Sequence, residues 1–198
     1  MGPNLKPLMH PLSYFILAIC SGLAPVAAAE TALIDLSDPA GDASAVPNVS
    51  GQGKANETDI HFAGQGKDRS MVVACQACAG GFPGVVITPL HGSAWDLSGS
   101  GYIEASVSNP GAADVMLWIR ADNAGDWKKS PWDTEQVRVG AGCTVPVRVT
   151  FGRSMGKQGY ALDAKAVTRV LLFELQPTAP ATFVVHALVA GGKAGNPP

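Results

Sequence analysis

Hydrophobic residues occupy every second position over residues 103–107, and over residues 115–120 the aliphatic Val115, Leu117 and Ile119 alternate with Met116, Trp118 and Arg120. This period of two is typical of β-strands that bury one face, so both segments are predicted to be strands. Residues 109–111 (Asn-Pro-Gly) lie between them and favour a turn. We therefore expect the two strands to form a hairpin, with residues 115, 117 and 119 facing the core.

Similar patterns predict further strands at residues 33–36, 60–62, 71–75, 85–87, 145–151, 170–175 and 183–189. Residues 170–175 are apolar on nearly both faces, as in the central strand of a sandwich. A long loop is predicted over residues 38–57, and residues 162–167 carry the only helix signal, about one turn long. About nine or ten short strands favour an all-β fold, a jelly-roll β-sandwich of the galactose-binding-domain-like kind.

The N-terminus has the pattern of an export signal rather than of a folded element. An apolar run at residues 14–23 follows Lys6, and Ala27 and Ala29 then form a small-x-small cleavage pattern before Glu30. The run is shorter than the roughly 20 apolar residues of a transmembrane helix. We expect cleavage after Ala29 and a secreted or periplasmic protein that does not span a membrane.

The domain organisation follows from this leader. Residues 1–29 are predicted to be a signal peptide, residues 30–190 a β-sandwich domain, and residues 191–198, which are rich in Gly and Pro, a flexible tail. Hydrophobic residues make up 46% of the chain, which excludes a disordered protein. The formal net charge of −2 and the 15% of charged residues provide no basic surface for nucleic acid.

Three cysteines remain after cleavage: Cys75, Cys78 and Cys143. They allow three alternative single disulfides, and each alternative leaves one free thiol. Cys75 and Cys78 have the spacing of a redox or zinc motif, but a turn-forming sequence follows them and no second pair exists. We expect a structural bridge or unreactive thiols, with the pairing left open.

Five short motifs occur in a familiar order. They are residues 95–99 (WDLSG), 107–111 (VSNPG), 118–123 (WIRADN), 147–151 (VRVTF) and 162–170 (LDAKAVTRV). This order resembles the galactose-binding-like β-sandwich modules found beside the catalytic domains of agarases and related polysaccharide-degrading enzymes. The resemblance covers about half of the chain, and it implies a carbohydrate-binding module with the jelly-roll fold.

The candidate binding residues are aromatic. All four tryptophans lie between residues 95 and 132, and aromatic rings stack well on the flat apolar faces of sugars. Trp118 falls with Arg120 on the strand face opposite the predicted core, and Trp127 and Trp132 fall in the predicted loop 122–133. Trp95 precedes a strand and is expected to be structural. The predicted ligand-binding residues are Trp118, Arg120, Asp122, Asn123, Trp127 and Trp132.

Carboxylates near the N-terminus are weak candidates for a structural calcium ion, because hard cations prefer several oxygen ligands. These residues are Asp35, Asp38, Asp42 and Glu57. No twelve-residue calcium-binding loop is present, so solvated loop carboxylates are the alternative interpretation. The sequence predicts no other cofactor.

Catalysis would require its own set of residues, and a glycosidase needs two carboxylates about 5–10 Å apart. Glu104 and Glu174 stand alone on their predicted strands, and Glu135 lies near Asp133 at a loop edge. The chain also lacks a Gly-x-Ser-x-Gly elbow. We therefore expect a non-enzymatic protein that binds a polysaccharide or oligosaccharide. The alternatives are a structural or protein-interaction domain of the cell envelope and, third, a small polysaccharide hydrolase or lyase.

Overall fold

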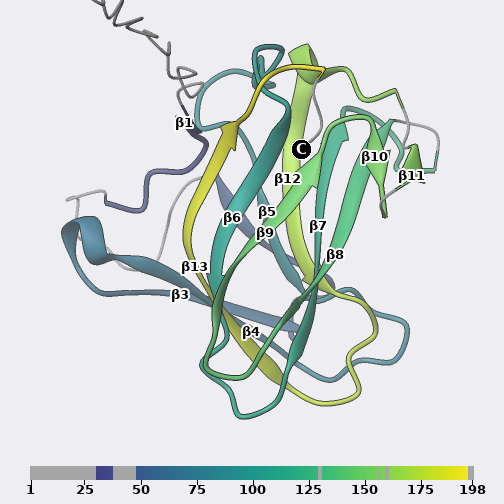
Figure 1. The fold of residues 1–198 in the computed structure, drawn as a ribbon. Helices are drawn as coiled ribbons and strands as arrows, with labels where there is room; N and C mark the ends of the chain where they lie inside the picture. Colours follow the sequence, from purple (N-terminus) through teal and green to yellow (C-terminus); the bar gives the residue numbers. More distant parts are fainter. Residues whose placement is uncertain (1–29, 38–47, 129–130, 156, 159–160, 196–198) are drawn as a thin grey trace, which may run out of the picture.

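The computed structural model describes residues 30–37, 48–128, 131–155, 157–158 and 161–195. These residues form two mostly antiparallel sheets that pack against each other as a β-sandwich (Figure 1). The predicted leader at residues 1–29 lies outside the described residues. In the part of the chain that is described, no helix is long and apolar enough to cross a membrane.

Six strands form the first sheet: β3 (Thr58–Ala63), β4 (Ser70–Cys75), β13 (Ala181–Gly191), β6 (Tyr102–Ser108) and β9 (Thr144–Thr150) in that order, with β1 (Thr31–Ala32) also paired to β13. Seven strands form the second sheet, in the order β11 (Lys157–Gln158), β10 (Arg153–Ser154), β8 (Trp132–Val139), β7 (Val115–Asn123), β12 (Val167–Glu174), β5 (Gly84–Ile87) and β2 (Val49–Gln52). Two short 3-10 turns, at Gly66–Asp68 and Ala164–Ala166, complete the secondary structure of the residues that the structure describes.

The core lies between the two sheets and is built from alternate residues of the long strands. On β7, Leu117 and Ile119 are fully buried, and on β13 Phe183 and Val185 are fully buried from the opposite sheet. Burying one face of each strand in this way provides the main stabilisation of a sandwich, through apolar area removed from water. The prediction of an all-β sandwich, with residues 115, 117 and 119 facing inward, is confirmed.

The predicted hairpin at residues 103–119 is wrong. β6 pairs with β13 and β9 in the first sheet, whereas β7 pairs with β8 and β12 in the second. The turn at residues 109–111 therefore carries the chain across from one sheet to the other. Alternation fixes which face of a strand is buried, but it does not specify the partner strand, and a sandwich offers partners in two layers.

Several shorter segments also differ from the predictions. Residues 33–36 do not form a strand, although Leu33 is buried and its N–H donates to the carbonyl of Leu188 at 2.9 Å. β2 forms inside the predicted loop 38–57, and β8 begins inside the predicted loop 122–133. These strands contain Gly, Ser, Asp and Gln, and pairing with neighbouring strands outweighs their weak intrinsic preference for β-structure.

Candidate functional site

The outer surface of the seven-stranded sheet carries the aromatic and charged residues that the sequence singled out. Residues on β7 alternate between the core and this surface, so that Trp118 and Arg120 face outward, as predicted. Trp118 lies in register with Gln136 of β8 on one side and with Phe173 of β12 on the other. Neighbours in register share a face of the sheet, and their side chains therefore meet on the outer surface.

Trp118 is supported by two phenylalanines. Its ring is stacked on that of Phe173, with centroids 6.2 Å apart and 18° between the planes. Phe82 meets the other side of Phe173 edge-on, with centroids 6.2 Å apart and an interplanar angle of 76°. Both are favourable aromatic geometries, and together they hold Trp118 at the surface in one orientation.

The neighbouring strand β5 approaches β12 closely beside Phe173. Gly84 of β5 lies opposite Phe173 in the register, where a Cβ atom would come within 2.5 Å of the Phe173 Cα atom and 2.1 Å of the Leu172 carbonyl oxygen. Only glycine can approach β12 this closely without a shift of the backbone.

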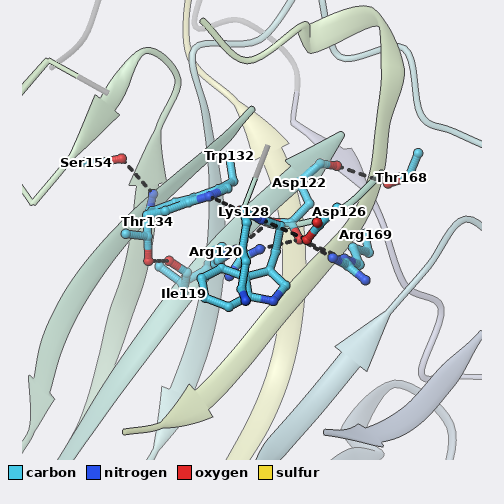
Figure 2. A network of polar contacts seen from close by, with 11 residues as sticks. Ile119, Arg120, Asp122, Asp126, Lys128, Trp132, Thr134, Ser154, Thr168 and Arg169 are labelled. Carbon is cyan, nitrogen blue, oxygen red and sulfur yellow. Dashed lines mark hydrogen bonds and ion pairs between the residues drawn. The ribbon is translucent and has the colours of Figure 1, made fainter. Parts of the chain in front are cut away.

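Arg120 and Arg169 share one carboxylate, that of Asp122 (Figure 2). Arg120 donates to both oxygens, from Nε at 2.6 Å and from Nη2 at 2.8 Å, while Arg169 of β12 donates from Nε to Oδ2 at 2.7 Å. The Asp122 side chain is only 3% exposed. Such bidentate, charge-assisted hydrogen bonds are strong, and they fix the orientation of both guanidinium groups. We call these three residues the arginine cluster.

Two tryptophans lie beside the arginine cluster. Trp127 precedes β8, and Trp132 is its first residue. Trp132 is in register with Asp122, and the Arg120 guanidinium lies 4.9 Å from the centre of its ring. The Trp132 indole N–H donates to the carbonyl of Trp127 at 2.9 Å. Trp127 itself is 54% exposed, with the Lys128 ammonium 5.6 Å from its ring. The structure thus brings the predicted residues Arg120, Asp122, Trp127 and Trp132 together.

Asn123 does not belong to this group. Its side-chain amide donates to the carbonyls of Asp163 and Ala166, and its oxygen accepts from the backbone N–H of Asp163, all at 2.7–2.8 Å. Asn123 therefore anchors the segment before β12, and the structure does not bring its side chain together with the arginine cluster. Asp122 is likewise occupied by the two arginines, so its role is to position them.

A groove of about 980 Å³ opens near the start of β7, and residues of both sheets line it, among them Trp118 of β7 and Thr182 of β13. Its walls are the loops at residues 109–114 and 175–180, and its lining includes Met116, Trp118 and Gln136. Met116 is 42% exposed, which leaves apolar surface open to solvent beside the Trp118 ring. Trp118 thus connects the groove with the arginine cluster, which lies farther along β7.

Two acidic residues are buried without full hydrogen bonding. Asp133 is completely buried on β8; its Oδ2 atom accepts from the Gly152 N–H at 2.7 Å, and its Oδ1 atom has no partner among the described residues. Burial raises the pKa of Asp133 to about 6. Burial also raises the pKa of Glu174, which lines the groove, although its contact with the Cys75 thiol opposes that effect.

The carboxylates considered for catalysis are spread over the sandwich. Glu104 lies on the first sheet and pairs with Arg148, at 2.7 Å. Glu135 and Asp133 lie two residues apart on β8, not at a loop edge as expected, and Glu174 lies at the end of β12. Cys75, Cys78 and Cys143 are free thiols in this structure, and burial raises the pKa of Cys75.

The calcium prediction remains a prediction, because Asp38 and Asp42 lie outside the described residues. Asp35 is exposed, and its Oδ1 atom accepts hydrogen bonds from the N–H and the hydroxyl of Ser37. Glu57 is buried and accepts from the Lys54 N–H at 2.9 Å. Among the described residues, no three His, Cys, Asp or Glu side chains gather in a way that could hold a metal ion.

Sequence reasoning missed three residues of this face: Phe82, Arg169 and Phe173. The signal for two of them was present in the β12 pattern. Arg169 and Phe173 fall on the positions opposite Val170 and Leu172, which are fully buried. Arg169 and Phe173 reach the candidate site because β12 lies directly beside β7. That pairing joins segments about fifty residues apart in the sequence.

The fold is similar to that of known carbohydrate-binding modules. The Family 11 carbohydrate-binding module from Clostridium thermocellum, solved with a beta-1,3-1,4-mixed-linked tetrasaccharide, has a TM-score of 0.61 and 12% identity, with 86% of this chain and 99% of that chain covered. A Family 29 module complexed with mannohexaose has a TM-score of 0.50 and 11% identity, with coverage of 83% and 92%.

Domains of two agarases have the same fold. An exo-beta-agarase gives a TM-score of 0.58 at 12% identity and a second agarase 0.62 at 9%, with 79% and 84% of this chain covered. The chain spans only 24% and 25% of the length of these agarases. No protein-family model and no curated protein matches the sequence. The similarities confirm the β-sandwich fold and its predicted resemblance to modules of polysaccharide-degrading enzymes.

Proposed function

We propose that this protein binds a polysaccharide, without catalysis, on the outer surface of its seven-stranded sheet. The observation that carries the proposal is the position of Trp118, which faces solvent, is held by Phe173 and lines a groove. Sugar rings present flat apolar C–H faces, and a fixed aromatic ring beside polar groups is suited to bind them. The fold shared with carbohydrate-binding modules supports the same conclusion.

The spacing of the aromatic residues favours a chain of sugars over a single ring. Trp118 is in register with Gln136 of β8, which lies four residues from Trp132 on the same strand. Four residues span about 13 Å along a strand. Trp118 and Trp132 would each stack on a sugar, and Arg120 and Gln136 would donate hydrogen bonds to hydroxyl groups between them. The groove at the Trp118 end would accommodate further sugar units.

A partner protein in the cell envelope would use an exposed aromatic surface in a different way. Protein partners favour broad, flat patches, whereas Trp118 and Met116 border a groove between two loops. The groove therefore favours a glycan over an envelope protein as the ligand.

Export is part of the proposal. The leader pattern of residues 1–29 supports delivery to the periplasm or the exterior, where polysaccharides are found. Expression of the full chain in a bacterial host with sequencing of the mature N-terminus should give a protein that begins at Glu30. Retention of residues 1–29 in the cytoplasm would contradict export without affecting the binding site.

Binding is tested by affinity electrophoresis of the purified protein in gels that contain agarose, xylan or mixed-linkage β-glucan, followed by calorimetry on the retaining glycan. We expect retention by at least one glycan and a loss of about tenfold or more in affinity for Trp118→Ala, since tenfold corresponds to about 1.4 kcal/mol. Trp127→Ala and Trp132→Ala should give smaller losses.

Tyr102→Ala is the matched control, because Tyr102 is an aromatic residue on the outer surface of the first sheet. It should bind like the unaltered protein. The proposal is wrong if no glycan retains a protein that circular dichroism shows to be folded, or if Trp118→Ala and Tyr102→Ala have the same effect.

A further inference from the structure

The arginine cluster carries more positive than negative charge. Two guanidinium groups, those of Arg120 and Arg169, share the single carboxylate of Asp122, which leaves one positive charge unmatched. The chain as a whole has a net charge of −2, so this local excess runs against the overall balance. Charges fixed by hydrogen bonds on a partly buried surface are screened less than free surface charges.

The two arginines differ in how accessible they are. The Arg120 side chain is 15% exposed, because it lies against the ring of Trp132. The Arg169 side chain is 36% exposed. A guanidinium group has five N–H donors, and Arg169 uses only Nε and Nη2 toward Asp122. Its remaining donors have no partner among the described residues, so part of this fixed and partly exposed guanidinium group is available to a ligand.

Arg169 lies on the path that the glycan would follow. It is in register with Asp122, which is in turn in register with Trp132, so the three residues form one row across β12, β7 and β8. Phe173 and Trp118 form a parallel row four residues along β12. A sugar stacked on Trp132 would therefore have its edge toward Arg169.

We propose that the polysaccharide bound on this face is acidic, and that Arg169 binds its anionic substituent. This inference rests on the proposed function and specifies the class of glycan. The substituent is a planar or tetrahedral group with several charged oxygens, either the carboxylate of a uronic acid or a sulfate ester. The guanidinium fork binds both groups with two parallel hydrogen bonds, and neutral hydroxyl groups gain less from it.

The experiment compares glycans that differ only in charge. Polygalacturonate is paired with its methyl ester, and native κ-carrageenan with the chemically desulfated polymer. We expect the charged member of at least one pair to bind roughly tenfold more tightly at low ionic strength, and the difference to shrink above about 0.15 M salt. The pair that shows the difference identifies the substituent as carboxylate or sulfate.

Arg169→Gln should abolish that preference, so that the charged and neutral members of the pair bind with similar affinity. Asp122 keeps its contact with Arg120 in this variant, so the fold is preserved. Arg148→Gln is the matched control: Arg148 lies on the other sheet, is 35% exposed and pairs with Glu104. It removes the same charge and should leave the preference intact.

The outcomes separate the two proposals. If the neutral and charged members bind equally, and Trp118→Ala weakens both, the acidic preference is wrong and glycan binding stands. If Arg148→Gln reduces the preference as much as Arg169→Gln, the effect is one of net charge, and the role of Arg169 is wrong. If none of these glycans binds but agarose, xylan or mixed-linkage β-glucan does, only the acidic preference is wrong; if no glycan in either experiment binds, both proposals are wrong.

Discussion

The ring of Trp118 on β7 lies nearly parallel to that of Phe173 on β12, with 18° between their planes and 6.2 Å between their centroids. Phe173 is only 8% exposed, although it belongs to the solvent side of the sheet, because Trp118 and Phe82 cover it from both sides. Phe173 is therefore a support for the proposed binding residue and has little surface of its own for a ligand.

This relationship predicts that Phe173→Ala weakens glycan binding without removing a direct contact. Loss of the stacking partner frees the Trp118 ring, and we expect affinity to fall several-fold, while the free energy of unfolding falls by about 3 kcal/mol. Calorimetry and urea denaturation measure the two effects. Phe173→Leu should retain most of the stability; if it also retains full affinity, the orienting role of the ring is refuted.

Asp122→Asn should destabilise the protein strongly. The substitution leaves two guanidinium groups close together around a nearly buried site without a countercharge, and breaking such a pair costs about 3 kcal/mol or more. Urea denaturation provides the measurement. The double variant Asp122→Asn with Arg169→Gln should recover part of the loss, since one of the two repelling charges is removed. A loss that is fully additive would contradict the shared contact.

Asn123→Ala should affect stability and leave binding unchanged. The substitution removes three hydrogen bonds that hold the backbone at residues 163–166, and we expect the free energy of unfolding to fall by about 2 kcal/mol. Affinity for the retained glycan should stay within about twofold. A large loss of affinity in a protein of near-normal stability would restore the direct binding role expected from the sequence.

Stability should fall as the pH rises from about 4 to 6. The pKa of Asp133 is about 6 in the folded protein, above the value of about 4 in the unfolded chain, so the folded state holds the proton more tightly. The stabilisation is complete below the unfolded pKa, and on the order of 3 kcal/mol is lost by the time the pH exceeds the folded pKa. The raised pKa of Glu174 acts in the same direction.

Urea denaturation between pH 4.5 and 7.5 tests this pH dependence. Asp133→Asn should remove most of the slope, and Glu174→Gln should remove a separate part. The lowered pKa values of Asp35, Asp96 and Asp114 act in the opposite sense and at lower pH, where protonation of these carboxylates destabilises the fold. If Asp133→Asn has the same slope as the unaltered protein, Asp133 does not carry a raised pKa.

Alternation on single strands was enough to predict much of the site. It placed Trp118 and Arg120 outside and Leu117 and Ile119 inside, because side chains on a strand point to opposite faces in turn. It also identified β12 as a central strand, from apolar residues on both of its faces. Alternation did not predict β8, because this strand has polar residues, such as Asp133 and Glu135, at positions where a strand with one buried face normally has apolar ones.

The sequence by itself determined the all-β class, most of the core residues and the aromatic character of the proposed ligand site. Those properties follow from local period and residue type. Only the tertiary structure decided that β6 and β7 lie in different sheets, and that Arg169 and Phe173 join Trp118 on one surface. The physical reason is that strand pairing is non-local: a strand offers hydrogen bonds at both edges, and the packing of the whole sandwich selects the partners.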